Sequence, residues 1–160
     1  MTHSDKSGII LPPILAPIQV IIIPIYKNKK EYNKIFKKLI ILKKILKKTN
    51  ISAKIDNRYT HSPGWKFSEY EIKGVPIRIS IGEKEVMKNL VEVTRRDTKE
   101  KVLIKIENIK KKIPIILKNI QDDIYEKALK FKNSNIKKIN NYDDFKESIK
   151  KGGLIIAHWD

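Results

Sequence analysis

The segment from Asp56 to Arg78 places aromatic rings directly beside cations and carboxylates. Its rings are Tyr59, Trp65, Phe67 and Tyr70, and Lys and Glu side chains lie between them. An unpaired nucleobase stacks on an aromatic face while its phosphate meets a cation. This mixture of residue types therefore favours contact with single-stranded nucleic acid.

The same segment also has a purely structural interpretation. A short helix could bury Trp65 and Phe67 in a core and leave the polar residues between them in solvent. On such a helix Lys66, Glu69 and Lys73 share one side. The residues alone leave both interpretations open.

Motifs for catalysis are scarce. The sequence has no glycine-rich phosphate loop, no GxSxG and no HExxH. The acidic pairs Asp122–Asp123 and Asp143–Asp144 lie at helical positions, where carboxylates usually face solvent or favour the helix dipole. We expect no catalytic residue in this chain.

The sequence also argues against a metal site. Cysteine is absent, which excludes a disulfide scaffold, a thiol nucleophile and a thiolate-ligated metal. The three histidines, His3, His61 and His158, lie far apart and lack zinc-type spacing.

The charge balance suggests a polyanionic partner. The chain of 160 residues has 35 Lys+Arg and 18 Asp+Glu, which gives a formal net charge of +17. Such a charge indicates nucleic acid or an anionic surface. Because Lys, Ile and Asn dominate the composition, AT-rich coding could account for part of it. The four arginines stand out from this background, and Arg offers a planar fork that Lys lacks.

Hydrophobic patterning predicts an α/β fold. An apolar run at 18–25 predicts a strand buried on both faces, and 30–48 has the period of an amphipathic helix. A strand at 51–56, a helix from Pro63 to about Lys73 and a hairpin over 75–96 follow. Helices near 106–132 and 142–151 and a strand at 154–159 complete the chain. This alternation predicts one compact domain with a mostly parallel sheet covered by helices.

No segment is typical of a membrane span or a signal peptide. Residues 11–26 are very apolar, but four prolines interrupt them and they are too short to cross a bilayer. The N-terminal MTHSDKSG lacks a basic leader region. A cytoplasmic protein with no membrane partner is the simplest expectation.

Four stretches give the sequence a family resemblance. They are MTHSDKSGIILPPILAPIQVIIIPIY, PGWKFSEYEIKGVPIR, VEVTRRDT and YDDFKESIKKGGLIIAHW. Together they closely resemble prolyl-tRNA synthetases of the archaeal/eukaryotic-like type, in collinear order over the whole chain. The resemblance implies a class II anticodon-binding domain over 17–160, preceded by the tail of a catalytic domain over 1–16. It also implies a three-layer α/β/α fold with a five-stranded mixed, mostly parallel sheet.

The resemblance has consequences for activity and partners. In that family ATP and Mg²⁺ serve prolyl-adenylate formation through three class II motifs that this chain lacks, so we expect the chain alone to be inactive and to hold no cofactor. Three alternatives remain for the origin of this chain: a fragment, a split half, or a decayed gene product. Its protein partner would be a separate catalytic domain or a second copy in a homodimer of the parent enzyme. A further alternative is a stand-alone basic RNA-binding module without ligase activity.

The resemblance finally implies that the two guanines of proline anticodons are recognised here. A guanine edge offers two donors that Glu69 or Asp56 could accept, and two acceptors that Arg58, Arg78 or Lys66 could reach. A base could stack on Trp65 or Tyr59. The complete set of expected RNA-binding residues is Asp56, Arg58, Trp65, Lys66, Glu69, Lys73, Arg78 and Arg96.

Overall fold

The computed structural model describes residues 3–158 and divides into two compact units. The first unit is Met1–Asp122 and the second is Asp123–Asp160. The sequence pattern predicted one compact domain, so this division is a correction. The 27-residue helix α4 (Ile109–Asn135) contributes to both units.

The first unit contains a five-stranded mixed sheet, as predicted. Its strand order is β4-β3-β5-β6-β7, with β3 at Val20–Pro24, β4 at Ala53–Ile55, β5 at Ile77–Ile81, β6 at Leu90–Arg95 and β7 at Lys101–Lys105. β3 pairs in parallel with β4 and β5, whereas β5–β6 and β6–β7 are antiparallel. The predicted hairpin is therefore confirmed. The sheet is evenly mixed rather than mostly parallel, because β7, which the sequence pattern missed, adds a second antiparallel pair.

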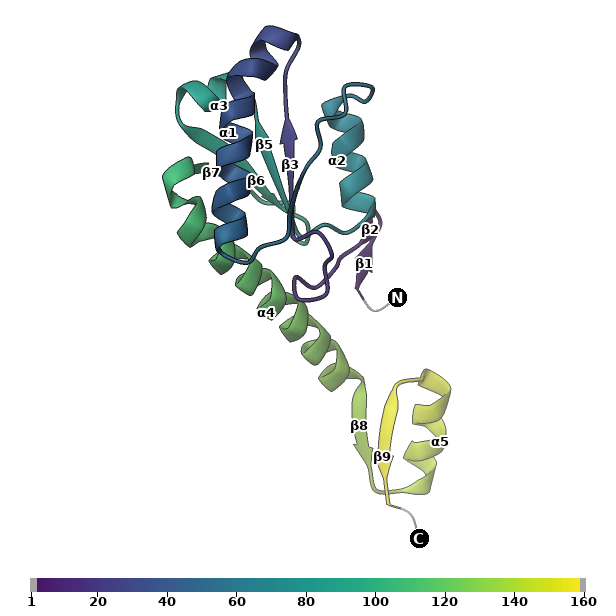
Figure 1. Ribbon diagram of the computed structural model, residues 1–160. Helices are drawn as coiled ribbons and strands as arrows, with labels where there is room; N and C mark the ends of the chain where they lie inside the picture. The colour runs from purple at the N-terminus through teal and green to yellow at the C-terminus, as the bar shows by residue number, and fades with distance from the viewer. Residues whose placement is uncertain (1–2, 159–160) are drawn as a thin grey trace. The chain divides into compact units, whose positions relative to one another are not determined.

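Two helices cover opposite faces of this sheet. α1 (Lys29–Lys48) connects β3 to β4 on one side, and α2 (Pro63–Ile72) connects β4 to β5 on the other side of β3. Both crossovers join parallel strands, and right-handed crossovers in opposite directions put the two helices on opposite faces. Figure 1 shows β3 running between α1 and α2. This is the predicted α/β/α layering.

Local sequence explains where these helices begin and end. The side chains of Asn28 and Ser62 cap α1 and α2, and Pro63 occupies the first turn of α2, where its missing N–H costs nothing. Gly74 follows α2 with a φ of 72°, a conformation that favours glycine. A Cβ at Gly74 would lie 2.7 Å from the carbonyl oxygen of Ile9, so a larger residue would also clash.

The core of the first unit is aliphatic. Alternate residues of β3 face opposite helices, and Ile21 and Ile23 pack with Tyr70 and Val75 on the α2 side. The remaining residues of β3 are buried as well, as expected for a central strand.

The other elements of the first unit are short. They are the hairpin β1 (Ser4–Asp5) and β2 (Gly8–Ile9), helix α3 (Glu83–Met87) and the 3₁₀ turn Ile106–Asn108 before α4. The predicted helix at 106–132 is therefore α4 preceded by this turn. Pro114 lies inside α4, where it removes one backbone hydrogen bond.

The second unit is a small βαβ arrangement. β8 (Ile136–Ile139) and β9 (Leu154–Ala157) pair in parallel and α5 (Tyr142–Lys151) connects them. α5 confirms the helix predicted at 142–151, and the side chain of Asn141 caps its start. The strand predicted at 154–159 belongs to this separate sheet, and its last residue, Trp159, lies outside the described residues.

Candidate nucleic-acid interface

A buried carboxylate organises the loop between β4 and α2. Asp56 directly follows β4 and is only 2% exposed. Arg58 binds it as a fork, with Nε 3.0 Å from Oδ1 and Nη2 2.6 Å from Oδ2. The same Nη2 also donates to Glu69 of α2. Arg58 therefore connects the loop to the helix.

Lys66 lies beneath this arrangement. Its side chain is buried, its Nζ lies 3.8 Å from Oδ1 of Asp56, and it donates to the Asp56 carbonyl at 3.4 Å. Burial lowers the pKa of Lys66, while the charge of Asp56 opposes that change. The amine thus faces the protein interior, although the sequence placed it among the RNA-binding residues.

The electrostatics keep the carboxylates ionised. Burial alone would raise the pKa of Asp56, but hydrogen bonds from Arg58 and the charge of Lys66 lower it to about 2. A hydrogen bond from Lys73, 2.5 Å away, is the main cause that lowers the pKa of Glu69. Burial, aided by the charge of Asp56, raises the pKa of Tyr70 to about 12.

Trp65 lies at the surface beside these groups. It is 46% exposed, with the Arg58 guanidinium 5.3 Å from its ring and the His61 ring centroid 3.9 Å away. Tyr59, on the same loop, is 88% exposed. The structural interpretation of the segment thus holds for Phe67, which packs on the core, and fails for Trp65. The sequence analysis considered His61 only as a metal ligand and did not predict the contact of its ring with Trp65.

A cavity of about 240 Å³ lies beside α2 on the other side of this helix from the loop network. Its lining includes Phe67, Arg78, Arg96, Lys99 and Lys101. Cations therefore dominate the polar part of its wall, and an aromatic ring closes another part.

Arg78 has unused hydrogen-bonding capacity in this cavity. Its guanidinium carbon lies 4.0 Å from the centroid of the Phe67 ring, and Nη2 donates to Thr94 at 3.3 Å. Its buried Nε has no hydrogen-bond partner in the described part of the chain. Burial lowers the pKa of Arg78. Unsatisfied buried donors are rare in proteins and call for an explanation.

Arg96, in contrast, is fully engaged. It is 5% exposed, its Nε donates to the Glu71 carbonyl at 2.7 Å, and its two Nη atoms bind Asp5 at 2.7 and 2.8 Å. The hydrogen bonds from Arg96 lower the pKa of Asp5 well below its usual range. Arg96 therefore attaches the β1–β2 hairpin to α2.

The eight residues predicted to bind RNA thus lie along α2 and the elements that contact it. Five of them have a partly exposed side chain or an unused donor: Arg58, Trp65, Glu69, Lys73 and Arg78. The other three are buried within ion pairs: Asp56, Lys66 and Arg96.

The aromatic residues of the first unit are concentrated in one stretch of the sequence that includes α1 and α2. Every Phe, Tyr and Trp between residues 1 and 122 falls between Tyr26 and Tyr70. Among these residues only Tyr70 is buried, because the core is built from Ile, Leu and Val. Rings at a surface beside cations are typical of sites that stack unpaired bases.

Residues 3–158 offer neither a metal site nor a membrane span. Within them, no three His, Asp or Glu side chains converge as metal ligands. No helix in this part of the chain is sufficiently long and apolar to traverse a bilayer.

The fold and this surface define a class of protein: an α/β domain with exposed aromatic rings beside cations, a combination typical of domains that stack unpaired bases. The family model described as "Anticodon binding domain" matches residues 19–115, and the chain belongs to this family.

Relatives agree with this assignment. The chain is 49% identical over 160 residues to a proline–tRNA ligase of Phocaeicola vulgatus and 47% identical over 161 residues to one of Amoebophilus asiaticus. These matches cover 100% of this chain but 32% and 33% of those proteins. The chain therefore spans about a third of the length of these curated relatives. Its identity to them confirms the resemblance to prolyl-tRNA synthetases.

A solved structure gives the same result. Prolyl-tRNA synthetase from Cryptosporidium parvum, in complex with L-proline and AMP, matches 99% of this chain and 34% of its own, with a TM-score of 0.93 and 36% identity. The α/β fold predicted from the sequence is thereby confirmed.

Proposed function

We propose that this chain is the tRNA-recognition part of a proline–tRNA ligase and binds the unpaired anticodon bases of proline tRNA. The observation that carries the proposal is Arg78, whose buried Nε lacks a partner beside a cationic, aromatic-walled cavity. A base edge entering that cavity would meet the guanidinium of Arg78, which lines the wall and donates to Thr94 through Nη2.

The chemistry fits guanine. Its O6 and N7 accept hydrogen bonds from a guanidinium such as that of Arg78. The second guanine could use the network on the other side of α2, because a Watson–Crick edge offers donors and a carboxylate has about four acceptor positions. Each oxygen of Glu69 receives one cation, Lys73 or Arg58, so acceptor positions remain on both.

The buried members of the predicted set have a different role in this proposal. Asp56 holds Arg58 in place, Lys66 supports Asp56 from beneath, and Arg96 holds the cavity wall, so these three position the contacts. Arg58, Trp65, Glu69, Lys73 and Arg78 are the proposed RNA contacts. Exposed lysines elsewhere supply affinity for phosphates without sequence information.

The remaining functions belong to the whole protein and rest on its relatives. Prolyl-tRNA formation with ATP and Mg²⁺, pairing with a catalytic domain or a second copy, and a place in cytoplasmic translation are part of this proposal. The residues that would bind ATP and Mg²⁺ lie outside this chain.

A binding measurement tests the proposal. The 160-residue chain should bind a proline anticodon stem-loop at least tenfold more tightly than the same loop with both guanines changed to adenine, because one good base contact discriminates by about 1–3 kcal/mol. Equal affinity would leave only charge-driven RNA binding.

A further inference from the structure

Three aromatic rings form a chain along the start of α1, away from the cavity. The ring centroids of Tyr26 and Tyr32 are 4.9 Å apart, and those of Tyr32 and Phe36 are 5.7 Å apart. Tyr26 and Tyr32 are half-buried, whereas Phe36 is 45% exposed. The series therefore ends in a ring that is open to solvent.

The helix geometry shows which flank carries these rings. Tyr32 and Phe36 are one turn apart and lie on one side of the buried stripe of α1. Lys34 and Lys38 lie on the other side, where they bind Glu83 and Asn89. Since α1 contacts α3 and β4, the rings lie on the flank toward β4, the edge strand of the sheet.

This flank continues from the Asp56 network. Tyr26 follows β3 and Asp56 follows the neighbouring parallel strand β4, and the Asp56 N–H donates to the Ile22 carbonyl at 3.0 Å. Both residues thus lie at the carboxyl end of the same strand pair. Burial, together with the charges of Tyr32 and Asp56, raises the pKa of Tyr26.

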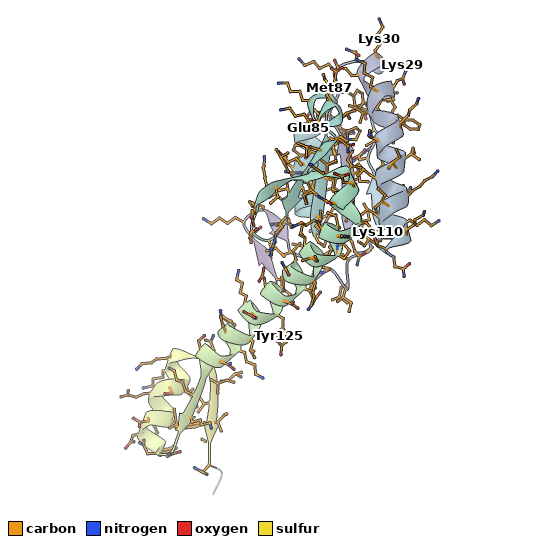
Figure 2. The ribbon with its side chains drawn as sticks, turned by 90° about the vertical axis from the view of Figure 1, so that its left-hand side faces the viewer. Lys29, Lys30, Glu85, Met87, Lys110 and Tyr125 are labelled. Carbon is orange, nitrogen blue, oxygen red and sulfur yellow. The ribbon has the colours of Figure 1, made fainter. Side chains whose placement is uncertain are left out.

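Exposed lysines lie on the same helix as Tyr32 and Phe36. Lys29 and Lys30 lie at the N-terminal end of α1 (Figure 2) and are exposed. Lys43, two turns beyond Phe36 on the same flank, is also exposed and forms no ion pair within residues 3–158. An exposed ring among unpaired lysines suits a base with its phosphate.

We propose that Tyr26, Tyr32 and Phe36 form a second stacking platform that takes an unpaired base of the same RNA strand, next to the bases bound near α2. The inference rests on the proposed function and deepens it. Phe36 presents the outer face to the base, and the two tyrosines hold Phe36 in position.

A packing role alone accounts for only part of the platform. Contact between a residue before the helix and one in its first turns stabilises a helix start, and Tyr26 and Tyr32 have this relation across the Asn28 cap. Phe36 lies a turn further on, and its 45% exposure is not needed for that purpose.

The test measures binding of the 160-residue chain to a proline anticodon stem-loop that carries 2-aminopurine at one loop position at a time, outside the two guanines. Stacking on an aromatic ring quenches this fluorescent base. We expect quenching at one position, removed by Phe36→Leu and preserved by Phe36→Tyr. Phe36→Leu should weaken binding about tenfold, which corresponds to about 1.4 kcal/mol and to one stacked base.

Matched controls separate stacking from other losses. Phe131→Leu changes a 72% exposed phenylalanine on α4 and should leave affinity unchanged. A blunt RNA duplex, which has no unpaired base, should bind Phe36→Leu and the unmutated chain equally. Thermal unfolding checks that each variant is folded.

The outcomes distinguish this inference from the proposed function. Guanine preference without quenching at any loop position, or unchanged affinity in Phe36→Leu, overturns the platform and leaves the anticodon proposal intact. Quenching lost in Phe36→Leu without guanine preference supports the platform and overturns guanine recognition. If Phe36→Leu does not fold, absence of quenching in the unmutated chain alone rejects the platform.

Discussion

Replacing the buried Asp56 with Asn should flatten the acid dependence of stability. The folded protein holds the pKa of Asp56 at about 2, below its ordinary value of 3.8. Its ionised form is therefore favoured by folding, and this contribution is complete above pH 3.8 and lost as pH falls toward 2. At 1.36 kcal/mol per pKa unit, the contribution is about 2 kcal/mol.

The assay is urea unfolding followed by circular dichroism between pH 6 and pH 2, for the unmutated chain and for Asp56→Asn. Asp5 and Glu69, whose pKa values are also lowered, titrate in both proteins. The unmutated chain should lose about 2 kcal/mol more than the variant across this range. Parallel curves would show that Arg58 and Lys66 do not favour the ionised carboxylate, and the described network would be refuted.

Three further predictions concern the same surfaces. Lys66→Met should lower the preference for guanine and raise the pKa of Asp56. If Lys66 instead contacted a phosphate, the variant would bind all RNAs more weakly by the same factor and the pKa of Asp56 would not change. Asp5→Asn should raise proteolytic cleavage in residues 3–10, measured by mass spectrometry, since Arg96 holds that hairpin; unchanged cleavage would contradict this. Stem-loop affinity should fall as salt rises, with a log–log slope of about −0.7 for each single-strand phosphate contacted, and a flat response would exclude phosphate contacts.

A further prediction concerns catalysis. The 160-residue chain should show no proline-dependent exchange of pyrophosphate into ATP, because its sequence lacks the class II motifs. Exchange by a purified sample, absent from a mock preparation, would refute this expectation.

The apolar period was sufficient to predict α1, and a proline start was sufficient to predict α2, whereas α5 follows a capping Asn. β7 was missed because its residues are mostly exposed and do not alternate clearly, so pairing with β6 determines its conformation. Local pattern carries little information on such long-range pairing.

The sequence pattern also did not predict the division into two units. The apolar stripe of α4 continues to Phe131 in the sequence, but the last buried residue along α4 is Ile124, and Phe131 is 72% exposed. Periodicity shows which face of a helix is apolar and does not show where its packing partner ends.

Composition drew attention to 56–78, and the ion-pair network around Asp56 lies in this segment. The cavity is only partly built from it, because Thr94, Arg96, Lys99 and Lys101 also line the wall. Composition could not show that Lys66 and Arg96 are buried, because each depends on a partner brought close by the fold: Asp56 across a loop, and Asp5 from a distant hairpin.

The most direct test of the central claim is a double-mutant cycle between Arg78 and the guanines of the anticodon. Affinities of the unmutated chain and Arg78→Ala are measured for the proline loop and for the loop with both guanines changed to adenine, with Lys44→Ala as an exposed control. If Arg78 recognises guanine, Arg78→Ala costs about 1–3 kcal/mol on the proline loop and much less on the adenine loop, while Lys44→Ala costs both loops a similar, smaller amount. Equal losses for Arg78→Ala on the two loops would contradict guanine recognition in the cavity.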